Sequence, residues 1–230
     1  MKSLYTDDFY TASQDLSRAS ASKYASLLYE HYQPNSVVDV GCGRGAWLSA
    51  FEEVGASNLV GIDGDWNQQS NIINDRIQYY AQDLNQIIRL DQKFDLAISV
   101  EVAEHLLPES GFGFVESLTG LADVVVFGAA FVKQGGVGHI NEIRHSEWAD
   151  FFSSWGFEPF DIFRSRVWED DTVAWWYQQN TFLYVNTQHE LYQRLIQKNI
   201  MPISNKKFMN CVHPYLYAQK LNLINDKQTR

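Results

Sequence analysis

The chain has 230 residues, 45% hydrophobic and 20% charged, so it is long enough to bury a core and has the composition of a globular protein. A net charge of −10 argues against a broad electrostatic grip on a nucleic-acid backbone, which needs clustered Lys and Arg. Two cysteines cannot form a disulfide framework, and no apolar run approaches the roughly 18 residues of a membrane span. We therefore expect a cytoplasmic protein without a membrane span; these features do not indicate its oligomeric state.

The pattern of apolar residues divides the chain into three parts. A loosely amphipathic helix is expected between Asp7 and Tyr32, and Gln33-Pro34-Asn35 ends it. Alternating strands and helices follow, and a short helix is expected over Glu190–Lys198. We therefore predict a lead-in helix in residues 1–33, a core domain in 34–186 and a helical appendage in 187–230.

A glycine-rich turn follows the first expected strand, Val37–Val40. The next apolar residues have helical spacing, so Gly41, Gly43 and Gly45 lie between a strand and a helix. Glycine reaches positive φ and lets the backbone approach a ligand, while the helix N-terminus offers free N–H groups. The turn is where a nucleotide would lie, although no Gly-Lys-Ser/Thr run marks a Walker phosphate site.

Three further expected strands end in acidic residues. The second ends in Asp63, which suits a carboxylate that binds two ribose hydroxyls. The third is followed by Asp83, and the fourth, Phe94–Val100, runs into Glu101–Leu106. The carboxyl ends of parallel strands meet at one edge of a sheet, so these residues should line one crevice.

The fifth strand is expected at Val124–Ala130, after a helix that begins near Gly111. Two more strands are expected at 157–163 and 181–185, which makes seven in all. This alternation predicts an α/β fold of the Rossmann-like type, with a mostly parallel sheet and helices on both faces.

Together these motifs resemble the class I S-adenosylmethionine-dependent methyltransferases, from about Val37 to Val185. The matching set is Asp-x-Gly-x-Gly-x-Gly, the acids after strands two and three, and Glu-Val-x-Glu-His-Leu. The resemblance implies an antiparallel last strand and S-adenosyl-L-methionine as cofactor. It places the methionine moiety at the glycine turn, the ribose at Asp63 and the adenine amino group at Asp83. The cofactor-binding residues that it implies are Asp39, Gly41, Gly43, Gly45, Asp63, Asp83, Leu84 and Val100.

Methyl transfer is an in-line displacement, so the protein must align donor and acceptor and, for a hydroxyl acceptor, remove a proton. If residues 101–105 are helical, Glu101, Glu104 and His105 share a face that looks into the crevice. An imidazole with an ordinary pKa of about 6.5 suits proton removal near neutral pH. His105 and His139 are the candidate bases, and Glu101 is the candidate orienting group.

The Glu-x-x-Glu-His triplet also resembles the small-RNA 3′-end 2′-O-methyltransferases, which bind a divalent metal through it and a later His. The corresponding His here is His139. This resemblance implies a metal site of Glu101, Glu104, His105 and His139 that holds Mg or Mn and lowers the pKa of a sugar hydroxyl. A plain His base and a purely structural His remain alternatives.

Two polar stretches are candidates for substrate binding. In the glycine-rich loop 135–142, Asn141 and Glu142 can hydrogen-bond a polyol. Farther along, aromatic rings beside Arg, Gln and Asn suit a sugar, whose C–H faces stack on rings, and Arg suits a diphosphate. A dense tryptophan cluster is also typical of a core. The candidates in this second stretch are Arg164, Arg166, Trp175, Trp176, Tyr177 and Asn180.

The pattern of both stretches resembles methyltransferases of bacterial and viral surface-glycan genes. We therefore predict an O-methyltransferase that acts on a hydroxyl of a small polar acceptor, a sugar or glycan intermediate. One alternative is metal-dependent RNA 2′-O-methylation, to which the seven basic residues after residue 186 would contribute. Another is a non-catalytic subunit that binds the cofactor and assists a partner.

Overall fold

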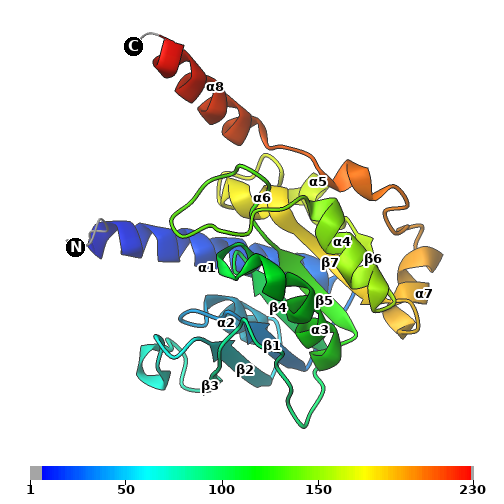
Figure 1. The fold of residues 1–230 in the computed structure, drawn as a ribbon. Coiled ribbons are helices and arrows are strands. Elements are labelled where there is room, and N and C mark those ends of the chain that lie inside the picture. Colours follow the sequence, from blue (N-terminus) through cyan, green and yellow to red (C-terminus); the bar gives the residue numbers. More distant parts are fainter. Residues whose placement is uncertain (1–6, 229–230) are drawn as a thin grey trace.

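The computed structural model describes residues 7–228, and the side chains of residues 16–222 except Ser70. Seven strands form one sheet in the order β3-β2-β1-β4-β5-β7-β6 (Figure 1). β7 is antiparallel to both of its neighbours, and the other pairs are parallel. The predicted fold class is therefore confirmed. The strands are β1 Ser36–Val40, β2 Asn58–Asp63, β3 Gln78–Ala81, β4 Leu96–Val100, β5 Val124–Gly128, β6 Phe157–Phe160 and β7 Thr181–Asn186.

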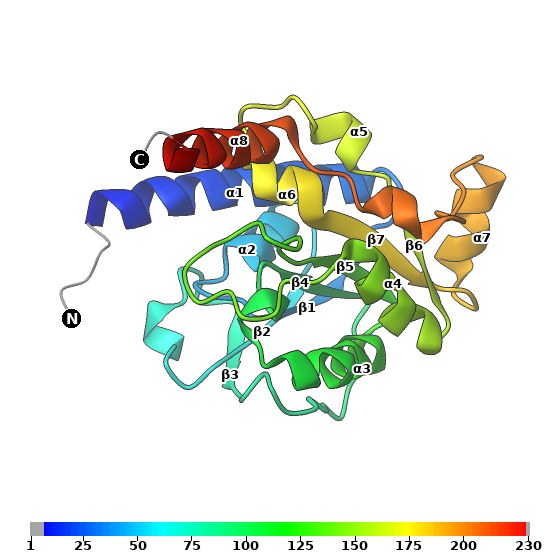
Figure 2. The ribbon, with the colours of Figure 1, turned by 45° about the horizontal axis from the view of Figure 1, so that its top comes forward.

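Helices cover both faces of the sheet (Figures 1 and 2). Two buried clusters lie on opposite faces, since Val37 belongs to one and Val38 to the other. The first cluster includes residues of α1, α2 and α7, and the second includes residues of α3 and α4. The helices are α1 Asp7–Tyr29, α2 Ala46–Glu53, α3 Gly111–Leu121, α4 His145–Ser154, α5 Arg164–Val167, α6 Trp175–Asn180, α7 Glu190–Gln197 and α8 Pro214–Gln228.

The alternation of strand and helix is less regular than predicted. Between β2 and β3 the chain forms only a 3₁₀ turn, Gln69–Asn71, and between β3 and β4 the structure places no helix in residues 82–95. Asn side chains replace helical hydrogen bonds in the first segment: Asn67 Oδ1 accepts from Gln68 N, and Asn74 Oδ1 from Arg76 N. Such local bonds compete with a helix.

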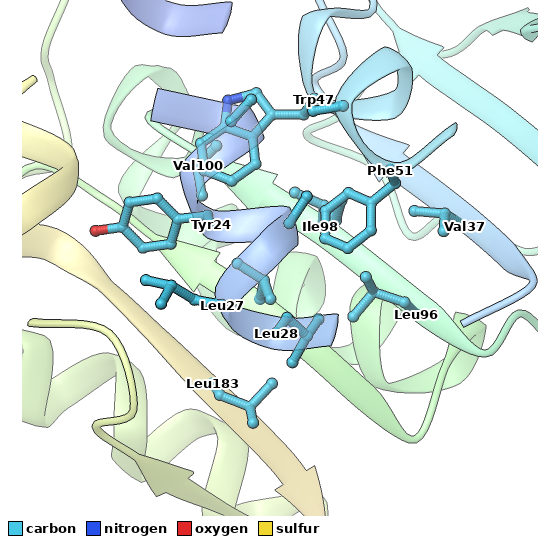
Figure 3. Close-up of a cluster of buried hydrophobic side chains, with 14 of the residues drawn as sticks. Tyr24, Leu27, Leu28, Val37, Trp47, Phe51, Leu96, Ile98, Val100 and Leu183 are labelled. Atoms are coloured by element: carbon cyan, nitrogen blue, oxygen red, sulfur yellow. The ribbon is translucent and has the colours of Figure 1, made fainter. Parts of the chain in front are cut away.

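The lead-in helix is part of the core. Tyr24, Leu27 and Leu28 of α1 face α2 and the strands (Figure 3). The Tyr24 hydroxyl donates to the Tyr177 carbonyl at 2.7 Å, and burial raises the pKa of this phenol, which therefore keeps its proton. In the part of the chain described, no helix has both the length and the hydrophobicity to cross a membrane.

We expect Leu28→Ala to lower the free energy of unfolding by about 2–5 kcal/mol, because Leu28 is fully buried between α1 and the sheet. Ser26→Ala on the exposed side of α1 is the matched control and should change stability by less than about 0.5 kcal/mol. Urea unfolding followed by circular dichroism measures both. Equal stability of the two variants would contradict the packing of α1 on the domain.

Candidate functional site

A cavity of about 870 Å³ opens where β1, β2, β3 and β4 end, beside the point at which the strand order reverses between β1 and β4. Its walls come from Gly41 and Gly43 after β1, from 63–66 after β2, from 81–85 after β3, and from Glu101 and His105 after β4. The structure thus brings the four predicted strand ends into one crevice. Three of the predicted cofactor-binding residues are not part of its described wall, namely Asp39, Gly45 and Val100.

The glycine turn needs glycine for two reasons. Gly41, Gly43 and Gly45 all have positive φ, of 88°, 52° and 89°. A Cβ at Gly41 would collide with the Val102 side chain, and one at Gly45 would lie 2.7 Å from Ile77 Cδ1. A Cβ at Gly43, in contrast, would meet no atom within 4 Å. Gly41 and Gly45 therefore allow the turn to pack against Val102 and Ile77, while Gly43 leaves open space at the cavity wall.

Asp63 ties this turn to the end of β2. Its Oδ2 accepts from Gly43 N and its Oδ1 from Gly64 N, both at 2.7 Å. Burial raises the pKa of Asp63 although these two hydrogen bonds oppose the rise. Beneath the turn, burial and the nearby Asp63 raise the pKa of Asp39 well above its usual value. Asp39 is therefore a buried acid away from the cavity wall, and Asp63 is the carboxylate at the cavity.

The opposite wall carries Asp83 and Leu84. Asp83 is exposed and accepts from Asn85 N at 3.0 Å and Asn85 Nδ2 at 3.1 Å. Those bonds lower its pKa, so the carboxylate is ionised at neutral pH.

Sequence reasoning missed two residues near the glycine turn. Trp66, 70% exposed, is part of the cavity wall. Asn67 is buried and its Nδ2 donates to the Gly43 carbonyl. An Asn soon after a strand end, within a Gly/Asp/Asn-rich loop, was the available signal.

The expected helical face over residues 101–105 was wrong. Glu101 N still donates to the Gly128 carbonyl at 2.9 Å, so the pairing with β5 extends one residue past β4. Glu101 then takes a φ of 56°, and only Ala103–His105 form a 3₁₀ turn. A left-handed Glu is an uncommon and strained conformation for a non-glycine residue.

Despite this difference, the structure brings Glu104, His105 and His139 together. One potential ligand atom from each lies within 4.8 Å of the others. The two imidazole rings are perpendicular, with centroids 4.8 Å apart. Glu104 is fully buried, and neither of its carboxylate oxygens has a hydrogen-bond partner among the residues described. Burial and the Glu101 charge raise the pKa of Glu104 well above its usual value.

Loop 132–143 is fastened to the end of β4 by backbone bonds. Ile140 N and Asn141 N both donate to the Glu104 carbonyl, and Asn141 Nδ2 donates to the Ala103 carbonyl. Glu142 Oε1 accepts from Gly135 N at 2.6 Å and lies 2.9 Å from His139 Nδ1. The predicted substrate residues Asn141 and Glu142 therefore shape the loop that holds His139 near His105.

His105 is exposed to the cavity, and its Nδ1 lies 3.3 Å from the Gly138 carbonyl. That contact favours the tautomer with its proton on Nδ1 and a free lone pair on Nε2. Burial, and then the nearby His139, lower the pKa of His105, so the neutral form dominates at neutral pH.

Glu101 belongs to a buried amide network that the sequence did not reveal. Its Oε1 accepts from Asn180 Nδ2 at 2.8 Å, while Asn180 Oδ1 lies 3.1 Å from His145 Nε2. Gln179 Nε2 donates to Gln134 Oε1 at 3.0 Å and to Asn180 Oδ1 at 2.9 Å. Asn180, a predicted substrate residue, thus holds the Glu101 carboxylate.

The other predicted substrate residues lie outside the cavity. Arg164 binds Asp161 Oδ2 at 2.7 Å and the Met209 carbonyl at 3.1 Å, and Arg166 pairs with Glu30. The hydroxyl of Tyr177, a buried residue, lies 3.2 Å from Ser17 Oγ. Trp175 and Trp176 line a second cavity.

Comparisons with known proteins agree with this geometry. A family model described as a methyltransferase domain matches residues 10–110. The mitochondrial ubiquinone biosynthesis O-methyltransferase of Dictyostelium discoideum is 31% identical over a segment that covers 31% of this chain and 27% of that protein. The match thus spans about a quarter of the curated relative's length.

Solved structures share the fold. DesVI of Streptomyces venezuelae superposes with a TM-score of 0.58 at 17% identity, covering 78% of this chain and 95% of that one. CalS10, described as an amino pentose methyltransferase from Micromonospora echinaspora with S-adenosylmethionine bound, gives 0.59 at 13% identity, covering 81% and 100%. The methyltransferase domain of a bacterial Hen1 gives 0.52 at 16%, covering 72% and 96%.

The family model, the curated relative and the sheet topology all point to the same domain type. The chain therefore has the fold of the class I S-adenosylmethionine-dependent methyltransferases, and residues 10–110 match the methyltransferase-domain family model.

Proposed function

We propose that this domain transfers the methyl group of S-adenosylmethionine to a hydroxyl of a small polar acceptor, a sugar or glycan intermediate. The observation that carries the proposal is His105, which faces the cavity with its Nδ1 beside the Gly138 carbonyl and its Nε2 free. A neutral imidazole at that position can take a proton from a hydroxyl. An acceptor that needs no proton removed would not need this arrangement.

The residues around the first cavity fit the cofactor. The open space at Gly43 leaves room for close backbone approach, and Asp63 and Asp83 offer carboxylates after β2 and β3. In this assignment Asp63 binds the ribose hydroxyls, Asp83 the adenine amino group, and the glycine turn the methionine end. When bound, the cofactor supplies a methyl group on a positively charged sulfur. This sulfur keeps the electron pair of the S–C bond when the methyl group is transferred.

The acceptor site lies on the His105 side of the cavity. Glu101 accepts a hydrogen bond from the acceptor hydroxyl or from a neighbouring one and so orients it, while His105 Nε2 takes the proton as the O–C bond forms. The amide network holds the Glu101 carboxylate through Asn180. CalS10, described as acting on an amino pentose, is a precedent for a sugar acceptor on this fold.

The orphaned oxygens of Glu104 support a second candidate, a divalent cation held by Glu104, His105 and His139. A buried carboxyl without a hydrogen-bond partner either stays protonated or faces a cation. Oxygen and imidazole donors suit Mg or Mn, and such an ion would lower the pKa of a vicinal hydroxyl. RNA 2′-O-methylation is the acceptor class that this version favours, and its RNA binding should weaken steeply with added salt.

We expect Asp63→Ala to abolish binding of S-adenosylhomocysteine in calorimetric titration, because the change removes the ribose carboxylate and releases Gly43 N. Asp83→Asn should weaken binding by roughly tenfold to a hundredfold, since a charged hydrogen bond is lost without disturbing the glycine turn. Asp91→Asn, an exposed acid before β4, is the control. Full affinity in Asp63→Ala would contradict the site assignment.

Incubation with isotope-labelled S-adenosylmethionine and a panel of nucleotide sugars and free sugars should give an O-methyl product, identified by NMR. His105→Ala should lower the rate by about 10²–10⁴-fold with unchanged S-adenosylhomocysteine affinity, while His31→Ala, outside the cavity, should have no effect. Because the pKa of His105 is lowered, the rate should fall only as pH drops below about 6.5. Methylation of nitrogen or carbon would contradict the proposal.

Titration of Mn²⁺ into the protein saturated with S-adenosylhomocysteine distinguishes the metal-dependent mechanism from the one that uses His105 alone as the base. If Glu104, His105 and His139 bind a cation, Glu104→Gln and His139→Ala should each lose the binding heat, whereas Asp91→Asn should keep it. Wild type that binds the cofactor product without any Mn²⁺ heat would favour the plain His105 base. A chain that binds the cofactor but methylates no acceptor, and that co-purifies with another methyltransferase, would favour the partner-subunit alternative.

A further inference from the structure

A second cavity, of about 510 Å³, shares no lining residue with the first. It is assembled from three parts of the chain: Leu16 on α1, the segment 168–178 around α6, and residues 213–215 at the start of α8. His213 closes it, because His213 N donates to Gln179 Oε1 at 2.8 Å and its Nε2 lies 3.2 Å from the Trp168 carbonyl. The C-terminal appendage thus completes a cavity that the core domain alone would leave open.

One wall of this cavity is aromatic. The Trp175 ring lies with its centroid 5.6 Å from that of Tyr215, 5.7 Å from that of Trp176 and 6.4 Å from that of His213. The centroid of the Trp168 ring lies 4.8 Å from that of His213. Trp175, Trp176 and Tyr215 keep part of their surface exposed. A continuous, partly exposed aromatic wall suits the C–H face of a ring-shaped ligand.

The cavity wall also contains a buried amide side chain, that of Gln178. Gln178 is only 4% exposed, and its Oε1 has no hydrogen-bond partner among the residues described. The Gln178 amide cannot be turned to exchange its two ends, because Nε2 already donates to the carbonyls of Asp170 and Val173 at 2.9 and 2.8 Å. The oxygen itself is buried, so the Gln178 amide forms part of the wall and offers no open hydrogen-bonding position.

Two exposed carboxylates, Glu169 and Asp171, also line the cavity, and no ion pair or hydrogen bond of either side chain is found within residues 16–222. Their neighbour Asp170 is different, since Thr172 and then Lys23 bind it and lower its pKa to about 2. No Lys or Arg is among the described lining residues. The described cavity wall therefore combines two carboxylates with aromatic rings and has no Lys or Arg to neutralise the carboxylates.

We propose that this second cavity binds an amino sugar. The protonated amine is attracted by the Glu169 and Asp171 carboxylates, and the C–H face of the sugar ring stacks on Trp175. A neutral sugar lacks the charge, and an anionic ligand is repelled. The inference rests on the proposed function in one respect: if the acceptor is a sugar, the second cavity would hold a second sugar unit. Binding of the amino sugar itself requires no methyl transfer.

The probe is glucosamine, titrated calorimetrically into the full chain, with glucose and cyclohexylamine as comparison ligands. Glucosamine should bind most tightly, because it alone carries both the ammonium and the hydroxyl-bearing ring. The double variant Glu169→Gln/Asp171→Asn should weaken glucosamine binding by at least about tenfold, as expected for lost charged hydrogen bonds. The control Asp91→Asn/Glu109→Gln removes two exposed acids elsewhere and should leave the affinity unchanged.

Neither carboxylate variant touches a described contact, so the double variant should unfold at the same temperature as wild type, and thermal melting checks this. Equal affinity for glucosamine and glucose, equal affinity for cyclohexylamine, or unchanged binding in the double variant would each overturn the proposal. Titrating S-adenosylhomocysteine into the same samples separates the proposed methyl transfer from the proposed amino-sugar site. Its failure to bind would count against the proposed methyl transfer, whereas loss of glucosamine binding alone would count against the second cavity.

Discussion

The interaction on which the first cavity depends is the pair of hydrogen bonds from Gly43 N and Gly64 N to the Asp63 carboxylate. They join the turn after β1 to the end of β2 and fix the distance between two walls. The positive φ values of the glycines are tolerated only without a side chain, so the turn has one conformation that these bonds select. Asn67 adds a second tie by donating to the Gly43 carbonyl. This edge of the first cavity is therefore held by hydrogen bonds within the protein itself.

The end of β4, in contrast, contains several groups whose burial or backbone conformation is energetically unfavourable. Two carboxyls, Glu101 and Glu104, lie close together, burial raises the pKa of both, and Glu101 has a left-handed backbone. Such strain and desolvation persist only when surrounding bonds compensate, and here Asn180 and the loop that carries His139 supply them. A set of costly groups next to a cavity is typical of functional sites, which is consistent with the role proposed for the end of β4.

The sequence predicted well that the strand ends meet in one crevice, because its signals are local. Gly41 and Gly43 follow a recognisable strand, and parallel strands necessarily bring Asp63 and Asp83 to the same edge. Contacts between distant segments carry no such signal. Nothing near Arg164 in the sequence shows that it binds the carbonyl of residue 209, and nothing near Asn180 shows that it binds residue 101. The helix expected over 101–105 was wrong for the same reason, since its start is paired with β5.

The two cavities are connected by hydrogen bonds although they share no wall. His213, which closes the second cavity, donates to Gln179, and Gln179 donates to Asn180, which holds the Glu101 carboxylate. A displacement of His213 would remove the hydrogen bond that its N–H donates to Gln179. The amides in this chain are buried, so a lost partner there is costly. The C-terminal appendage is therefore linked by hydrogen bonds to the carboxylate beside the candidate base.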